Sequence, residues 1–181
     1  MLYEARVLTL GDGREAVLRS PRAQDARAML DCLFTCATET DFIRRTPEEC
    51  VETEEEEARF LEGILASPDS LMIICLVEGR IAGSCHLMRY KRVKTRHRAS
   101  LGIALIREFW GLGIGRNMLA ELIQAAKDMG VSQLELQYLE GNERGRRLYE
   151  QLGFLEVGRH PNAVRLKDGR LLEEINMVKA L

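Results

Sequence analysis

The chain has 181 residues, enough to bury a core, and we expect residues 1–181 to form a single domain. Apolar residues make up 46% of it and charged residues 30%, as is typical of a globular protein. The net charge of −2 argues against a general attraction to nucleic acid or anionic lipid. No apolar run approaches the roughly 20 residues that a membrane span needs, and the first residues lack the layout of a signal peptide. We therefore expect a cytoplasmic protein without a membrane partner.

In chain order, the first predicted feature is a hairpin with strands at 5–10 and 15–20, joined by a turn at 11–13. Apolar residues at helical spacing follow over 22–37, and then a polar loop over 38–50. Thr53 and Glu56 form a capping-box pattern, which opens a second helix that runs to about Leu65. Three strands are then expected, at 70–77, 81–90 and 98–106.

The rest of the chain alternates between helix and strand before it ends in a second hairpin. Helices are expected at 115–130 and 143–153, and strands at 133–139, 154–160 and 171–181. The order ββααβββαβαββ predicts an α/β protein of the α+β type. Its central sheet is expected to be mixed and mostly antiparallel, with helices on both faces.

Five cysteines are spread over the first half of the chain: Cys32, Cys36, Cys50, Cys75 and Cys85. An odd number without a signal peptide favours reduced thiols over a disulfide framework. Cys32 and Cys36 have a spacing at which they would share a metal on one helix face, but no histidine lies near them in the sequence. We therefore expect buried, unligated thiols and no metal site.

Two segments concentrate charge. Residues 48–57 hold seven glutamates, and residues 89–98 hold six lysines and arginines together with His97. We interpret both as solvated surface, because acidic residues suit the first turn of a helix and one basic turn has a small electrostatic footprint. The alternative for the basic segment is a phosphate or nucleic-acid site, which predicts steeply salt-dependent binding. We expect no nucleic-acid partner.

Residues 107–116 read REFWGLGIGR, with glycines at 111, 113 and 115 between a predicted strand and a predicted helix. Such a cluster lets the backbone approach a ligand where side chains would block it. The segment is not a P-loop, because no Gly-Lys pair followed by Ser or Thr is present. Met118 stands where a dinucleotide fingerprint needs its last glycine, although Glu135 lies about 20 residues further on, as a ribose-binding acid would. The free N–H groups at a helix N-terminus suit a pyrophosphate without a lysine.

This loop resembles the cofactor motif V/I-x-x-x-x-Q/R-x-x-G-x-G/A of the GNAT superfamily of acyl-CoA N-acyltransferases. Its positions are held here by Leu105, Trp110, Gly113 and Gly115. Leu105 and Trp110 depart from the motif, but the resemblance assigns their roles mainly to the backbone. Residues 142–154, NERGRRLYEQLGF, resemble the superfamily's N-x-x-A-x-x-L-Y-x-x-x-G-F, with Gly145 in place of alanine. The resemblance covers about residues 15–181 and implies a GNAT-like fold.

The resemblance also implies acetyl-CoA as cosubstrate, no metal, and direct attack by an amine in a ternary complex. It places the cofactor contacts at Ile103, Ala104, Leu105, Trp110, Gly111, Leu112, Gly113, Ile114, Gly115, Arg116, Asn142 and Tyr149. Backbone N–H groups around 103–105 would face the developing oxyanion, where this strand parts from the strand at 133–139. The surrounding motif implies that Tyr149 protonates the leaving thiolate, whereas the residue taken alone indicates a core aromatic.

The group that takes the proton from the amine is the least determined. Some GNAT enzymes carry a glutamate on the strand before the glycine loop, where this chain has Ser100 and Gly102. We name Glu39, in the loop between the first two helices, as the candidate catalytic base. The other candidates on the acceptor side are Asp41, His86 and His97. Each of these residues is also readable as an ordinary loop charge or strand histidine.

The predicted function is an N-acetyltransferase acting on the primary amine of a small amino-acid-like metabolite, because HRASLGIALI and DGRLLEEINM resemble the branch with such acceptors. One alternative is a protein N-alpha or lysine acetyltransferase, for which the acidic residues 48–57 would attract a basic polypeptide. Another is a non-catalytic CoA-binding module. A homodimer through the edge strands is the default expectation.

Overall fold

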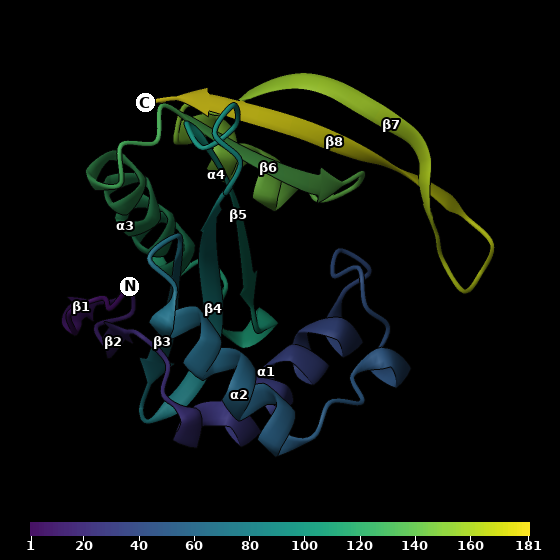
Figure 1. The fold of residues 1–181 in the computed structure, drawn as a ribbon. Coiled ribbons are helices and arrows are strands. Elements are labelled where there is room, and N and C mark those ends of the chain that lie inside the picture. Colours follow the sequence, from purple (N-terminus) through teal and green to yellow (C-terminus); the bar gives the residue numbers. More distant parts are fainter.

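The computed structural model describes residues 1–181 and contains one eight-stranded sheet with α-helices packed around it (Figure 1). The strands are β1 (Arg6–Thr9), β2 (Glu15–Arg19), β3 (Ser70–Val77), β4 (Arg80–Arg89), β5 (Arg98–Leu105), β6 (Gln133–Leu139), β7 (Leu155–Arg165) and β8 (Leu171–Ala180). The helices are α1 (Ala26–Glu39), α2 (Glu54–Ala66), α3 (Ile114–Asp128) and α4 (Glu143–Gln151). This order confirms the predicted succession of strands and helices.

The strands lie in the order β1-β2-β3-β4-β5-β6-β8-β7, and only the β5–β6 pair is parallel. The predicted mixed, mostly antiparallel sheet is therefore confirmed. The pairing of β5 with β6 ends at Ser100 and Glu135, although β5 continues to Leu105 and β6 to Leu139. The two halves of the sheet consequently splay apart, as Figure 1 shows, and the predicted parting of these strands is confirmed.

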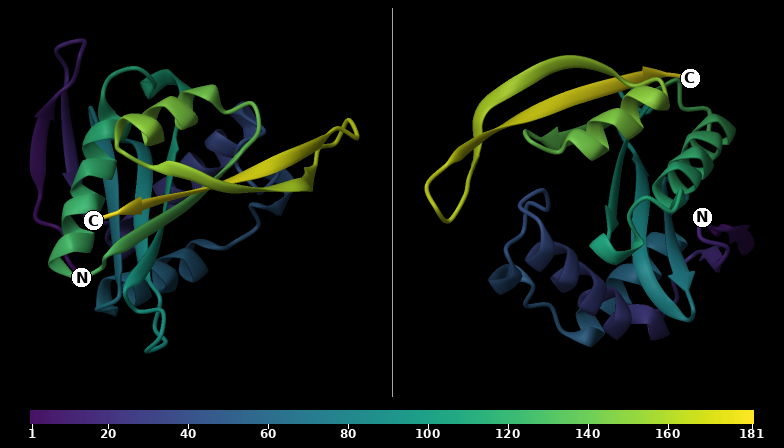
Figure 2. Two further views of the ribbon diagram at one scale, coloured as in Figure 1. Left: turned by 90° about the horizontal axis from the view of Figure 1, so that it is seen from above. Right: turned by 180° about the vertical axis from the view of Figure 1, so that it is seen from behind.

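Helices cover both faces of the first half of the sheet (Figure 2). Successive side chains of a strand point to opposite faces, and β4 illustrates this. Cys85 lies with its sulfur 3.9 Å from the carbonyl oxygen of Met118 in α3. The neighbouring Ser84 instead faces α1 and α2, where it lines a small cavity with Met29 and Phe60. The apolar stripes predicted for these helices are the faces that pack on the sheet.

Several element boundaries differ from the prediction, and two of them bear on the site. Helix α1 continues to Glu39, two residues past the expected end, so Glu39 lies at a helix C-terminus and not in the following loop. Strand β7 runs on to Arg165, because its register shifts between His160 and Val164 and so accommodates Pro161, which has no N–H to donate. The capping box that opens α2 is confirmed, since the Thr53 hydroxyl accepts from the Glu56 N–H at 3.2 Å.

The two charged segments lie on the surface. Six of the seven glutamates of 48–57 occupy a short turn and the first turn of α2, and Glu52 lies between the two. The residues between the basic strand ends Arg89 and Arg98 form an exposed turn. Four cysteines are buried and Cys50 is half-buried, all with free thiols. No group of His, Cys, Asp and Glu side chains is arranged to hold a metal ion. None of the helices has the length and apolar character needed to cross a membrane.

The β7–β8 hairpin extends beyond the rest of the sheet, and its far end bends back toward the segment that joins α1 to α2 (Figures 1 and 2). Ion pairs link the two. Lys167 Nζ lies 2.6 Å from Glu48 Oε1, and Arg170 Nη2 lies 3.7 Å from Asp41 Oδ2. Arg44, on the same segment, pairs with Glu174 of β8. The hairpin and residues 40–53 thus face each other across the open side of the splayed sheet.

Candidate active site

A cavity of about 360 Å³ occupies the opening between β5 and β6, and we call it the glycine-loop cavity. Its walls come from the end of β5, the segment 109–116, the start of α3, β6, α4 and residues 40–43. All but Leu112 of the residues predicted to contact a cofactor line this cavity. Leu112 instead turns its carbonyl outward, where it accepts a hydrogen bond from Gly11 N–H at 3.4 Å. Folding therefore brings together residues that are spread over more than forty positions of the sequence.

The glycine loop has the backbone conformation that its composition suggests. Gly111 and Gly113 have φ values of 85° and 86°, in the left-handed region that other residues rarely adopt. The first helical hydrogen bond of α3 runs from Asn117 N–H to Gly113 O at 3.2 Å, and no side chain caps the helix. The N–H groups of residues 114–116 therefore have no intrahelical acceptor. Together with the helix dipole, these donors make the loop suitable for phosphate oxygens.

The charge of the cavity is entirely positive. Arg116 and Arg144 line it, and no aspartate or glutamate does. Arg116 is the third residue of α3 and Arg144 the second of α4, so both cations lie at helix N-termini, where the helix dipole disfavours positive charge. An anion bound between the two arginines would offset the unfavourable interaction of each charge with its helix dipole. Arg144 was not predicted as a site residue, although a basic residue in a first helical turn directly after Asn142 is a signal that sequence reasoning can use.

The indole of Trp110 has a defined place in this wall. Its Nε1–H donates to the Leu105 carbonyl at 2.7 Å. The Arg107 guanidinium lies 5.6 Å from the ring centroid and the Arg144 guanidinium 5.5 Å from it. The sequence resemblance gave residue 110 a backbone role, and the structure adds a side chain that contacts two arginines.

Asn142 is the N-cap of α4. Its Oδ1 accepts from Gly145 N–H at 2.9 Å, which leaves the amide Nδ2 group beside the cavity. A Cβ at position 145 would lie 2.8 Å from Asn142 Nδ2, so the glycine that replaces the usual alanine makes room for this orientation of the amide.

Tyr149 lies both in the apolar core and in the cavity wall, so its position is compatible with each of the two interpretations of the sequence. Its ring packs at 6.0 Å from the Tyr138 ring and 6.3 Å from the Phe154 ring, and the residue also lines the glycine-loop cavity. Burial, with a smaller contribution from Tyr138, raises the pKa of Tyr149 to about 12. The hydroxyl is therefore protonated at neutral pH and can act as a proton donor toward the cavity.

A second cavity, of about 690 Å³, adjoins the first and shares Thr40 and Phe42 with it. We call it the hairpin cavity, because Leu166 and residues 170–172 of the β7–β8 hairpin form one wall. Its charged lining residues are Glu39, Asp41, Arg107, Glu140 and Arg170. The predicted base, Glu39, thus lies on this side and not in the glycine-loop cavity. Its Oε2 accepts from Arg107 N–H at 2.6 Å.

The other predicted alternatives lie elsewhere. His86 packs on β4 opposite Gly102, where a Cβ would come within 2.7 Å of His86 Cε1, and burial lowers the pKa of the imidazole. His97 belongs to the exposed turn before β5. Glu135 is held by the Arg98 guanidinium at 2.8 Å and by the Tyr90 hydroxyl at 3.1 Å, in the paired part of β5 and β6. The dinucleotide alternative therefore lacks a free ribose-binding acid next to the glycine loop.

Comparison with known proteins places this geometry among acetyltransferases. The model of the acetyltransferase (GNAT) family matches residues 36–154. The uncharacterized N-acetyltransferase YycN of Bacillus subtilis is 42% identical over 53 residues, which are 29% of this chain and 34% of that relative. The aligned stretch thus spans about a third of the length of this curated relative.

Solved structures resemble nearly the whole chain. An acetyltransferase of the GNAT family from Streptococcus pneumoniae superposes with a TM-score of 0.86 at 25% identity, over 92% of this chain and 99% of that one. Ribosomal-protein-alanine N-acetyltransferase from Brucella melitensis gives 0.79 at 27%, over 91% and 99%. A phosphinothricin acetyltransferase from Sinorhizobium meliloti, solved in complex with AcCoA, gives 0.80 at 22%, over 96% and 89%, and at that identity shows the shared fold alone.

Proposed function

The chain belongs to the GNAT family of acetyltransferases, and from this premise we propose that it transfers the acetyl group of acetyl-CoA to a primary amine. One observation carries the proposal. The glycine-loop cavity combines two left-handed glycines, an uncapped helix N-terminus and two arginines, with no carboxylate in its lining. This combination suits a ligand that carries several phosphate charges. A side chain at Gly115 would approach Leu148 Cδ2 to 3.2 Å, so the backbone there is already close-packed on one side.

Acetyl-CoA supplies an activated thioester, so the protein's main task is to hold the partners in attack geometry. We assign the backbone of residues 103–105 to the carbonyl oxygen, because this edge of β5 has lost its β6 partner and lines the cavity. Donors held in place by a strand need no reorganisation when charge develops. Tyr149 is assigned to protonate the departing thiolate, because it lines the cavity and its phenol is neutral at working pH.

The acceptor amine is proposed to enter through the hairpin cavity. Glu39, Asp41 and Glu140 line it, and carboxylates attract an ammonium group. We assign Glu39 to take the proton that the ammonium must lose. Its Oε1 makes no hydrogen bond within the chain, while Oε2 is held by Arg107 N–H. The lining also contains Arg107 and Arg170, which suit the carboxylate of an amino-acid-like acceptor.

Two acceptor classes remain, and each has support. A small amino-acid-like amine is favoured, since the same hairpin cavity is lined by both carboxylates and guanidiniums. The similar structure named for ribosomal-protein alanine supports a protein α-amine instead. The single domain over residues 1–181 and the homodimer stay predictions, and sedimentation velocity of the purified protein tests the second.

The first test is thermal unfolding with acetyl-CoA, CoA, NAD and ATP in parallel. A ligand at about 100 times its Kd stabilises the folded state by roughly 2.7 kcal/mol, which is a clear rise in Tm. We expect a rise with acetyl-CoA and CoA alone. A rise with NAD alone, or no rise with any of the four, would contradict the proposal.

The second test identifies the acceptor class. Labelled acetyl-CoA is offered with a panel of free amino acids and, separately, with unfolded cellular polypeptides. We expect label on small amines. Label on polypeptide alone would overturn the preferred acceptor while leaving the acetyl-transfer chemistry in place.

A further inference from the structure

Trp110 stands where the family motif has glutamine or arginine, and two guanidinium groups lie over its ring. We infer that Trp110 is a platform that holds the Arg144 guanidinium beside the glycine loop, where Arg144 binds a phosphate group of the acyl-CoA. The cation that a motif arginine would carry on the loop itself is thereby supplied from α4. The inference rests on the proposed function, because it takes the acyl-CoA as the ligand of the glycine-loop cavity.

The geometry joins three parts of the chain. Arg144 lies 5.5 Å from the centroid of the Trp110 ring, and its Nη2 would lie only 3.0 Å from a Cβ at Gly111. The guanidinium thus lies beside Gly111, at the start of the loop that leads to the free N–H groups of α3. Gly111, besides permitting a φ of 85°, leaves the space into which Arg144 reaches.

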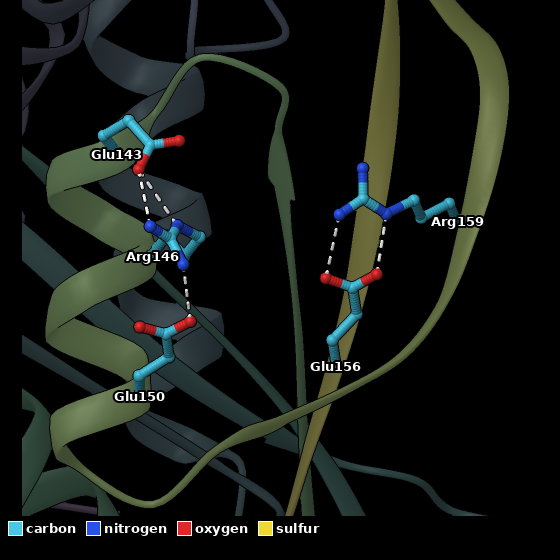
Figure 3. Close-up of polar contacts among 5 residues, drawn as sticks. All are labelled: Glu143, Arg146, Glu150, Glu156 and Arg159. Atoms are coloured by element: carbon cyan, nitrogen blue, oxygen red, sulfur yellow. Dashed lines mark hydrogen bonds and ion pairs between the residues drawn. The ribbon is translucent and has the colours of Figure 1, made fainter.

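Charge pairing distinguishes Arg144 from its neighbour on the same helix. Arg146 is held by Glu143 at 2.8 Å and by Glu150 at 2.9 Å, as Figure 3 shows. Arg144 forms no ion pair with any carboxylate and faces a cavity whose lining has none. A cation at the second position of a helix is opposed by the helix dipole, so an anionic ligand is the partner that would stabilise it.

The Arg144 guanidinium lies over the Trp110 ring, and none of its N–H groups donates a hydrogen bond within the chain. The N–H groups of a guanidinium lie in its plane, whereas contact with an aromatic ring uses its face. Trp110 can therefore restrict the long side chain without consuming the hydrogen bonds that a phosphate would accept. The indole is itself fixed by its 2.7 Å hydrogen bond to Leu105 O and by Arg107 on the ring. An aliphatic residue at this position would offer neither the ring face nor the N–H.

Trp110 is the only tryptophan of the chain, so its fluorescence reports directly on this site. We propose to titrate the wild-type protein and Arg144→Gln with CoA, dephospho-CoA and pantetheine. Loss of a charge-assisted contact should weaken CoA binding by roughly 10-fold or more and leave pantetheine, which has no phosphate, unchanged. Weakened binding of dephospho-CoA as well assigns the contact to the pyrophosphate, and unchanged binding assigns it to the 3′-phosphate.

Arg147→Gln is the matched control, because Arg147 is an exposed arginine on the same helix that forms no ion pair. It should bind CoA as the wild type does. If CoA affinity falls equally in both variants, the loss comes from the change in net charge, and the assignment to Arg144 is overturned. Equal CoA affinity in the wild type and Arg144→Gln would overturn it too. If the wild type itself fails to bind CoA, the proposed function fails, which is a separate outcome.

The platform role is tested by calorimetry, since the fluorophore is lost. Trp110→Leu should weaken CoA binding about as much as Arg144→Gln, and the double variant should be no weaker than either. Trp110→Phe keeps an aromatic face and should restore most of the affinity. Additive losses in the double variant, or a phenylalanine variant as weak as the leucine variant, would contradict the platform. Unchanged far-UV circular dichroism of each variant excludes misfolding as the cause.

Discussion

The glycine-loop cavity and the hairpin cavity share Thr40 and Phe42, yet they differ in charge. The first carries two arginines and no carboxylate, and the second carries three carboxylates together with two arginines. A ligand rich in phosphate is attracted to the first, while an ammonium group is attracted to the second. If acetyl-CoA and an amine bind as proposed, charge as well as shape separates the two substrates, and Thr40 and Phe42 form the wall at which they meet.

The means by which the two cavities hold their ligands also differ. The glycine-loop cavity is built on strands, helix termini and backbone N–H groups, which are set once the sheet has formed. The hairpin cavity depends on surface ion pairs such as Lys167–Glu48, whose side chains are 68% and 67% exposed. Exposed pairs contribute little and are screened by salt. Donor affinity should therefore be the more robust property and acceptor affinity the more adjustable one.

The largest effect is expected from a change in the backbone of the glycine-loop cavity. Gly113→Val places a β-branched side chain at a φ of 86°, directly at the N-cap of α3. We expect acetyl-CoA binding to weaken by roughly 100-fold or more, as measured by calorimetry. Gly130→Val is the control, because Gly130 also has a positive φ, 71°, but lies beyond the other end of α3 with nothing near its Cβ position. Equal losses in both variants would attribute the effect to backbone strain alone.

The next largest effect is expected on the rate of acetyl transfer, with no change in cofactor affinity. Tyr149→Phe removes the hydroxyl and keeps the ring that packs on Tyr138 and Phe154. We expect kcat to fall by about 100-fold, with the Kd for acetyl-CoA nearly unchanged. Tyr138→Phe, in the same cavity, should retain most of the activity. If Tyr138→Phe is the inactive variant, the proton donor has been assigned to the wrong tyrosine.

A smaller effect is expected on the acceptor side. Glu39→Gln removes the negative charge at the end of α1 and should lower kcat/KM for the amine by roughly 10-fold. The Kd for acetyl-CoA should not change, because Glu39 lies outside the glycine-loop cavity. Glu62→Gln, at an exposed position of α2, is the control for net charge. A weaker donor affinity in Glu39→Gln would break the distinction between the cavities.

The smallest effect is expected for the pH dependence of kcat, which should stay flat at alkaline pH. A phenol with its ordinary pKa near 10 would be half ionised at pH 10, but burial raises the pKa of Tyr149 to about 12. The proton donor should stay intact, and kcat should not decline between pH 8 and pH 10. A decline with an apparent pKa near 10 that is absent from Tyr149→Phe would show that the hydroxyl is solvated.

The raised pKa of Tyr149 also makes the free energy of unfolding depend on pH. The folded state holds the Tyr149 proton more tightly than the unfolded state does. Its contribution to the free energy of unfolding is therefore complete below pH 10 and is lost as the pH rises from 10 toward 12. Tyr149→Phe should flatten the fall in Tm over this range relative to the wild type.

Features governed by short stretches of chain were predictable from the sequence. The capping box of Thr53 and Glu56 and the positive-φ glycines of the loop are local, because neighbouring residues supply their hydrogen bonds and conformations. The order of the elements was predicted from hydrophobic periodicity, because the spacing of apolar residues indicates which face of a helix or strand is buried. Errors in the elements were confined to their ends, such as the two-residue extension of α1 to Glu39, because the last helical residues depend on what the helix end contacts.

The order of the elements, the glycine loop with its free N–H groups and most of the residues around the cavity follow from the sequence alone. Only the tertiary structure decided that Arg144 lies on Trp110, that Glu39 binds Arg107 N–H in a different cavity, and that the β7–β8 hairpin faces residues 40–53. The physical reason is separation along the chain. Such contacts join residues between 34 and 119 positions apart, and their geometry follows from how the sheet splays and not from any local propensity.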